Sequence, residues 1–161
     1  MELTLEDQVV DALSKRGWQI TTVESCTAGA VAARIVNVAG ASDVLKEAYI
    51  TYCDEAKAKI VGVRQETLDR YTAVSAETAE EMALGGIRIT GADVALSVTG
   101  LAGPGGGTPE RPVGLVYIGC AIHDKVQVKE LHLQGDRNEI RRQAVEEALR
   151  YGLQRLQMKT L

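Results

Sequence analysis

The sequence contains no phenylalanine, and aromatic residues make up only 4% of its 161 residues. A hydrophobic core must therefore be built from valine, leucine, isoleucine and alanine. The cysteines are few and far apart, at Cys26, Cys53 and Cys120. An odd, sparse set without metal-like spacing fits reduced thiols in the cytoplasm, which is where we expect the protein to be. No apolar run approaches the ~18 residues of a membrane span, and the acidic start MELTLEDQVV is not a signal peptide, so we expect no membrane partner.

An excess of positive charge is also missing. The chain has 18 Lys and Arg against 22 Asp and Glu, for a net charge of −4. A mildly acidic protein matches a nucleic-acid backbone poorly, so we expect no nucleic-acid partner. Small anionic ligands stay possible, because a local site can oppose the net charge. The histidines, His123 and His132, fall in strand-like segments, and we expect no zinc site from them.

Proline and glycine are concentrated in one place. All three prolines lie between Pro104 and Pro112, and six of the 16 glycines lie between Gly100 and Gly114. Glycine permits positive φ and a close approach of the backbone to a ligand. The segment has no Gly-Lys-Ser/Thr, and no helix follows it, so it is neither a Walker A loop nor a dinucleotide fingerprint. A ligand-binding loop and a plain connector both remain open.

Hydrophobic spacing and capping residues predict an alternation of helices and strands that ends in a hairpin. Capping boxes are expected at Thr4 with Asp7 and at Asp136 with Glu139. The expected helices cover about 4–16, 25–36, 55–61, 64–71, 75–89 and 140–156, and the expected strands cover 18–23, 44–53, 94–98, 113–122 and 126–133. This order predicts one α/β domain over 1–161, a three-layer α/β/α sandwich with a mixed sheet of about five strands. In such folds, sites form where strands end and helices begin.

The first candidate segment is Glu24-Ser25-Cys26-Thr27-Ala28-Gly29, at a strand-to-helix turn. Free N–H groups at such a turn suit an oxyanion, and Ser25 is a candidate nucleophile there. The alternative is that Ser25 is only the N-cap of the helix. Cys26 is a rival nucleophile or a buried structural thiol.

Lys57 opens the helix after the next strand. A cation beside the positive end of a helix has a lowered pKa, and burial lowers it further. A neutral lysine is the base that a serine nucleophile without a histidine needs, whereas a surface lysine is the alternative. Arg137, at the start of the last helix, suits a carboxylate or phosphate, or else pairs with Glu139 or Glu130. Hydrolysis by a Ser-Lys pair is the chemistry that this set of residues best permits.

Five motifs occur in one order along the chain: Glu-Ser-Cys-Thr-Ala-Gly at 24–29, Tyr52 to Lys57, Ala73-Val74-Ser75, Ser97 to Pro104 and Arg111-Pro112-Val113-Gly114. Together they closely resemble the CinA C-terminal domain family, the nicotinamide-mononucleotide deamidases also called PncC. The resemblance covers about 5–156. It implies one three-layer α/β/α domain, usually a homodimer. It further implies hydrolysis of nicotinamide mononucleotide to nicotinate mononucleotide and ammonia, without metal or cofactor.

The resemblance also implies roles for single residues. It makes Ser25 the nucleophile and Lys57 its base, and Tyr52 matches the tyrosine before the lysine, which we expect to relay a proton. Arg137 is expected to meet an anionic group of the substrate, with Arg141 as the alternative. The remaining substrate-binding residues are expected to be Thr27, Thr99, Gly100 and Gly103.

The chain departs from the family pattern at two places. Ala28 replaces a usual glycine, and its methyl is expected to narrow the pocket. Cys53-Asp54 replaces a usual Ser-Asn, and the carboxylate of Asp54 is expected to favour the charged form of Lys57. Two alternatives to the deamidase therefore stay open: a non-catalytic nucleotide-binding or interaction member of the same fold, and a hydrolase of a different amide.

Overall fold

A computed structural model describes residues 2–158, and its strands form one sheet. The strands are β1 (Ile20–Glu24), β2 (Tyr49–Ile50), β3 (Val94–Gly100), β4 (Leu115–Ile122) and β5 (Lys125–His132). Their order across the sheet is β2-β1-β3-β4-β5. β1 runs parallel to both β2 and β3, whereas β3, β4 and β5 are antiparallel neighbours. The predicted mixed five-stranded sheet is confirmed.

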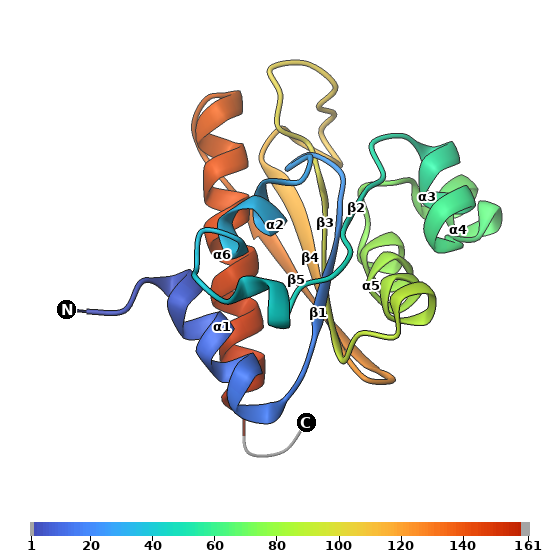
Figure 1. Cartoon of the computed structure of the whole chain (residues 1–161). Helices are drawn as coiled ribbons and strands as arrows, with labels where there is room; N and C mark the ends of the chain where they lie inside the picture. The colour runs from blue at the N-terminus through green and yellow to red at the C-terminus, as the bar shows by residue number, and fades with distance from the viewer. Residues whose placement is uncertain (1, 159–161) are drawn as a thin grey trace.

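Helices cover both faces of this sheet. They are α1 (Leu5–Arg16), α2 (Ala30–Ile35), α3 (Asp54–Val61), α4 (Gln65–Tyr71), α5 (Ala76–Thr90) and α6 (Arg137–Leu156), with a short 3-10 turn η1 (Ala41–Asp43). Figure 1 shows α1, α2 and α6 on one side of the sheet and α3, α4 and α5 on the other. The three-layer α/β/α arrangement predicted from the sequence is therefore confirmed.

Capping residues set the ends of the longer helices. Thr4 and Asp7 form the expected capping box at the start of α1, and Gly17 ends that helix in the left-handed conformation. Asp136 and Glu139 form the same motif at α6. Because Asp136 is the N-cap, α6 begins at Arg137 and not at the expected 140.

Two predicted elements differ from the structure. The helix expected over 25–36 is a turn as far as Gly29, and α2 begins only at Ala30. The strand expected over 44–53 is reduced to β2, with one further bridge between Leu45 and Ile20. β2 lies at the edge of the sheet, where only one neighbour is available for pairing.

The main core lies between the sheet and the layer of α1, α2 and α6, and a smaller cluster lies under α3 to α5. As the composition requires, the largest buried apolar side chains are aliphatic, such as Leu13, Leu96 and Leu149. β1, β2 and β3 are parallel, so their carboxyl ends lie side by side at one edge of the sheet, the edge formed by the ends of the strands. The glycine- and proline-rich loop projects from that edge (Figure 1). This edge is where the predicted site residues gather.

No helix between residues 2 and 158 is long and apolar enough to cross a bilayer. In the same part of the chain, no cluster of three or more His, Cys, Asp or Glu side chains has an arrangement that holds a metal ion.

Candidate active site

Ser25 and Lys57 are in direct contact. Ser25 directly follows β1, and Lys57 lies in α3. The Nζ of Lys57 is 3.0 Å from the Oγ of Ser25, and it donates a hydrogen bond of 2.8 Å to the carbonyl oxygen of Thr51. Only 1% of Lys57 and 8% of Ser25 is exposed. Lys57 is therefore not a surface lysine, and Ser25 is not an N-cap, since Gly29 occupies that position of α2.

The surroundings of Lys57 favour its neutral form. Burial lowers the pKa of Lys57 below its ordinary value, and this is the largest influence on the group. The nearby Asp54 carboxylate acts in the opposite direction and raises the pKa of Lys57, as expected from the sequence. Burial outweighs this attraction. A lysine amine with a lowered pKa is able to accept a proton from a serine hydroxyl.

The turn that carries Ser25 is organised by Glu24, the last residue of β1. Its carboxylate is fully buried and accepts four hydrogen bonds. Two come from the backbone N–H groups of Val31 and Ala32 in the first turn of α2, at 2.8 and 3.1 Å. Two come from the hydroxyls of Thr27 and Thr22, at 2.7 and 2.9 Å. Glu24 thus caps α2 from outside the helix, because the glycine at the N-cap has no side chain.

Glu24 holds the candidate site in place, a role that the sequence analysis did not assign to it. A signal was present: a glutamate ends a strand of otherwise buried type, Ile-Thr-Thr-Val-Glu. A carboxylate is rarely buried without partners. Its position directly before a candidate nucleophile indicates a role in holding the turn.

The backbone of the turn is fixed from two further directions. The Ser25 N–H donates to the Val98 carbonyl of the neighbouring strand β3 at 2.9 Å. Arg141 of α6 donates to the carbonyl oxygens of Cys26 and Thr27, at 2.8 and 3.2 Å. Within residues 2–158, the N–H group of Cys26 donates to no backbone carbonyl. This N–H, directly after Ser25, is a backbone donor that a ligand oxygen can approach.

A cavity of about 250 Å³ opens above Ser25 and Lys57. Most of the residues predicted for the site line it: Ser25, Tyr52, Lys57, Thr99, Gly100, Gly103 and Arg137. Thr27 does not, because its fully buried side chain donates to Glu24. The Thr27 side chain therefore supports the turn, and binding of substrate by Thr27 stays a prediction.

Arg137 connects the two sides of the pocket mouth. Its Nη1 donates to the Gly103 carbonyl at 2.7 Å, and its Nη2 donates to the Tyr52 hydroxyl at 3.0 Å. Among the described residues, neither Glu130 nor Glu139 is its partner, so the surface-pairing alternative is wrong. Tyr52 is 58% exposed, and its hydroxyl contacts Arg137 and not Lys57. A relay through Tyr52 stays a prediction.

The glycine-rich loop is a wall of the pocket and not a plain connector. Thr99, at its start, is buried and donates to the Ala73 carbonyl at 2.7 Å, which ties the loop to the segment before α5. At Gly100 an added Cβ would lie 2.6 Å from the Val116 Cγ2 and 2.8 Å from the Leu115 carbonyl oxygen. Only glycine therefore fits where the loop leaves β3.

The structure also settles two smaller expectations. Cys26 lines the pocket, but burial raises the pKa of its thiol to about 11, which leaves it protonated and weakly nucleophilic at neutral pH. Ala28 is exposed and does not line the pocket, so the expectation that its methyl narrows the pocket is wrong. It instead adopts the left-handed conformation with φ of 50°.

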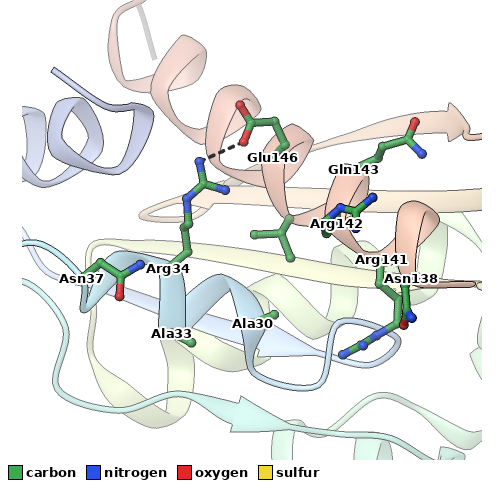
Figure 2. Close-up of a pocket in the computed structure, with 10 residues that line it drawn as sticks. Ala30, Ala33, Arg34, Asn37, Asn138, Arg141, Arg142, Gln143 and Glu146 are labelled. Atoms are coloured by element: carbon green, nitrogen blue, oxygen red, sulfur yellow. Dashed lines mark hydrogen bonds and ion pairs between the residues drawn. The ribbon is translucent and has the colours of Figure 1, made fainter. Parts of the chain in front are cut away.

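A larger cavity lies elsewhere, between α2 and α6, with a volume of about 840 Å³ (Figure 2). Its lining includes Arg34, which pairs with Glu146 at 2.9 Å, and Arg141. It contains no serine, cysteine or lysine among its lining residues, so the smaller pocket is the candidate catalytic site. The sequence left Arg137 and Arg141 as alternatives, and Arg137 is the one that lines the candidate catalytic pocket.

Comparison with known proteins shows the family of the chain. The family model described as the CinA C-terminal domain matches residues 2–156. The chain belongs to this family. A CinA-like protein of Kosmotoga olearia is 55% identical over 148 residues, and one of Dictyoglomus thermophilum is 49% identical over 140 residues. These stretches cover 92% and 87% of this chain but only 36% and 34% of the two relatives, so the chain spans about a third of their length.

Solved structures of the CinA family match over almost the whole chain. A CinA superfamily protein from Klebsiella pneumoniae superposes with a TM-score of 0.91 at 35% identity, covering 94% of this chain and 95% of that protein. The competence/damage-inducible protein CihA from Agrobacterium tumefaciens gives a TM-score of 0.89 at 36% identity, covering 98% and 100%. The three-layer fold is therefore shared with these CinA proteins.

Proposed function

We propose that the protein is an amidohydrolase that deamidates nicotinamide mononucleotide to nicotinate mononucleotide and ammonia. The proposal rests on one observation above all: the buried Nζ of Lys57, whose pKa is lowered, lies 3.0 Å from the Oγ of Ser25 at the base of a pocket. This is the arrangement of a serine nucleophile with a lysine base. Membership of the CinA C-terminal domain family supports the choice of substrate.

In the acylation step, neutral Lys57 takes the proton of Ser25 as the Oγ attacks the carboxamide carbon. The carbonyl oxygen becomes an oxyanion, which the N–H group of Cys26, directly after the nucleophile, stabilises. The C–N bond then breaks, and the proton held by Lys57 goes to the leaving nitrogen, which departs as ammonia. Water, deprotonated by Lys57, hydrolyses the ester, releases the nicotinate carboxyl group and regenerates the Ser25 hydroxyl.

The rest of the pocket positions the substrate. At about 250 Å³ the cavity is at the small end for ligand sites, which suits the carboxamide ring, with the remainder of the nucleotide extending past the pocket mouth. Arg137 lies at that mouth and meets an anionic group. The backbone of Gly100 and Gly103 also lines the pocket. Homodimer formation and a cytoplasmic location stay predictions.

Ammonia release from nicotinamide mononucleotide by the purified protein tests the proposal. We expect turnover by the wild type and none by Ser25→Ala, while Cys26→Ala keeps most of the activity. A panel of other primary amides is assayed in parallel. Ammonia release from another amide, but not from nicotinamide mononucleotide, would show that the substrate is that other amide. No ammonia from any amide would favour a non-catalytic binding protein. Full activity of Ser25→Ala would remove Ser25 as the nucleophile.

A further inference from the structure

Asp54 is a carboxylate in the catalytic pocket that the mechanism above does not use. It is the first residue of α3, is exposed, and is the acidic member of the residues that line the pocket. Within residues 2–158 it makes no hydrogen bond and no ion pair. An unpaired carboxylate inside a ligand pocket is therefore free to contact a ligand.

Asp54 is close to the catalytic pair. It precedes Lys57 by three positions on one helix, and this spacing places both on the same helical face. Its charge acts on Lys57 directly, since the carboxylate raises the pKa of that amine. In the free protein this effect opposes the general base, so the carboxylate has a cost unless it contributes to binding.

Stabilisation of α3 does not account for this placement. An acidic residue in the first turn interacts favourably with the helix dipole. Glu55 also lies in the first turn of α3, but it does not line the pocket. The helix therefore already has one acidic residue in that turn, whereas only Asp54 adds a charge to the pocket.

The pocket has a negative charge, from Asp54, and a positive charge, from Arg137, at different places. Asp54 lies beside Lys57, near the reacting centre, and Arg137 lies at the mouth. Lys57 itself is neutral when it acts as the base. A matching ligand has a positive charge next to the amide and a negative charge farther away. N-glycosylated nicotinamide has this pattern, because substitution of the ring nitrogen makes the pyridine ring a cation.

We propose that Asp54 is a specificity-determining residue, which pairs with the positive ring of an N-substituted pyridinium carboxamide and so selects it over neutral aromatic amides. The inference rests on the proposed function, because it takes the deamidated ring as its ligand. Asp54 binds the ring only and exchanges no proton with it. An isosteric asparagine keeps the shape of the side chain but removes this charge pair.

Dissociation constants test the inference without any turnover. They are measured in the Ser25→Ala background for nicotinamide mononucleotide and for its 1,4-dihydro form, which has the same ribose phosphate but a neutral ring. Asp54→Asn is expected to weaken binding of the cationic form by about three- to fivefold, the effect of one exposed charge pair, and to leave the neutral form unchanged. Glu55→Gln, the matched control, is expected to change neither.

Several outcomes would overturn the inference: equal weakening of both ligands, no weakening of either, or the same effect from Glu55→Gln. The proposed function fails separately. If the wild type releases no ammonia but the two ligands still respond differently to Asp54→Asn, only the reaction is wrong. If turnover occurs and the two ligands respond alike, only the role of Asp54 is wrong. Binding of neither ligand by any variant would reject both.

Discussion

The Nζ of Lys57 lies 3.0 Å from the Oγ of Ser25, although 32 positions separate the two residues. The contact exists because β1 ends and α3 begins at the same edge of the sheet, with the Thr51 carbonyl holding the amine in place. Both side chains are buried, and this burial is the largest influence on the pKa of Lys57. The fold therefore brings the two groups together and also favours the neutral form of the base.

Lys57→Met is expected to abolish ammonia release and to change how stability depends on pH. The pKa of Lys57 is lowered in the folded state, so between that value and the ordinary lysine value the unfolded chain binds more protons. The stability of the wild type therefore rises with pH across this window, whereas the variant lacks that contribution. Urea unfolding of both proteins at several pH values between neutral and alkaline measures the difference. Parallel stability curves would show that the pKa of Lys57 is not lowered.

Glu24→Gln is expected to weaken both the fold and catalysis. The amide keeps a single acceptor oxygen, and its NH2 group faces backbone N–H donors that need an acceptor. We expect a loss of about 1 to 3 kcal/mol in the free energy of unfolding and a fall in kcat larger than any rise in KM. Denaturant titration and steady-state kinetics measure the two effects. Glu66→Gln, on the exposed surface of α4, is the control and is expected to be neutral.

Gly100→Ala is expected to reduce both stability and activity. The added Cβ would approach the Val116 side chain and the Leu115 carbonyl, so the loop must shift where it leaves β3. A cost of about 1 to 3 kcal/mol is typical of such overpacking. Gly105→Ala, in the same loop, meets nothing within 4 Å and is expected to be tolerated. Thermal melts of the two variants compare them directly, and equal melting temperatures would contradict the prediction.

Arg137→Gln is expected to raise KM for nicotinamide mononucleotide by at least about tenfold, the loss of a charge-assisted contact, with a smaller change in kcat. The guanidinium also spans the pocket mouth between Gly103 and Tyr52, so part of the effect comes from a looser pocket. Arg142→Gln removes a charge from the same helix outside the pocket and serves as the control. If KM is unchanged in Arg137→Gln, Arg137 does not contribute to substrate binding.

Alkylation with iodoacetamide at neutral pH is expected to label Cys53 and to spare Cys26 and Cys120. Cys53 is exposed, whereas burial raises the pKa of Cys26 to about 11 and that of Cys120 to about 12. Mass spectrometry of the digested protein locates the label. In the Cys53→Ala variant that site is absent, so any loss of activity on alkylation must come from another cysteine. Rapid labelling of Cys26 with loss of activity in Cys53→Ala would restore that thiol as a candidate nucleophile.

Much of the fold followed from local signals in the sequence. The capping boxes at Thr4 and at Asp136 are encoded within a few residues, and both occur as expected. The β4–β5 hairpin likewise depends on near neighbours. These features were predictable because the interactions that determine them are short in sequence.

The features that were missed depend on residues distant in space or sequence. The helix after Ser25 begins late because the Glu24 carboxylate, from the preceding strand, binds its first N–H groups. β2 keeps only two residues of the expected strand, and directly after it the Thr51 N–H still donates to the Glu24 carbonyl of β1 at 2.8 Å. The burial of Lys57 depends on packing that no local pattern contains. The resemblance to a known family supplied the roles of single residues, which spacing alone left open.

Hydrogen bonds between neighbouring strands hold the backbone of Ser25 and the backbone of Thr51, whose carbonyl accepts from Lys57. The Ser25 N–H donates to the Val98 carbonyl of β3, and the Thr51 N–H donates to the Glu24 carbonyl of β1. The Thr51 carbonyl in turn accepts a hydrogen bond from the Lys57 amine. The spacing of neighbouring strands is a constant of β-sheets, about 4.8 Å whatever the side chains are. Because this spacing does not depend on side chains, substitutions around the pocket rim are expected to leave Ser25 next to the Thr51 carbonyl that holds the Lys57 amine.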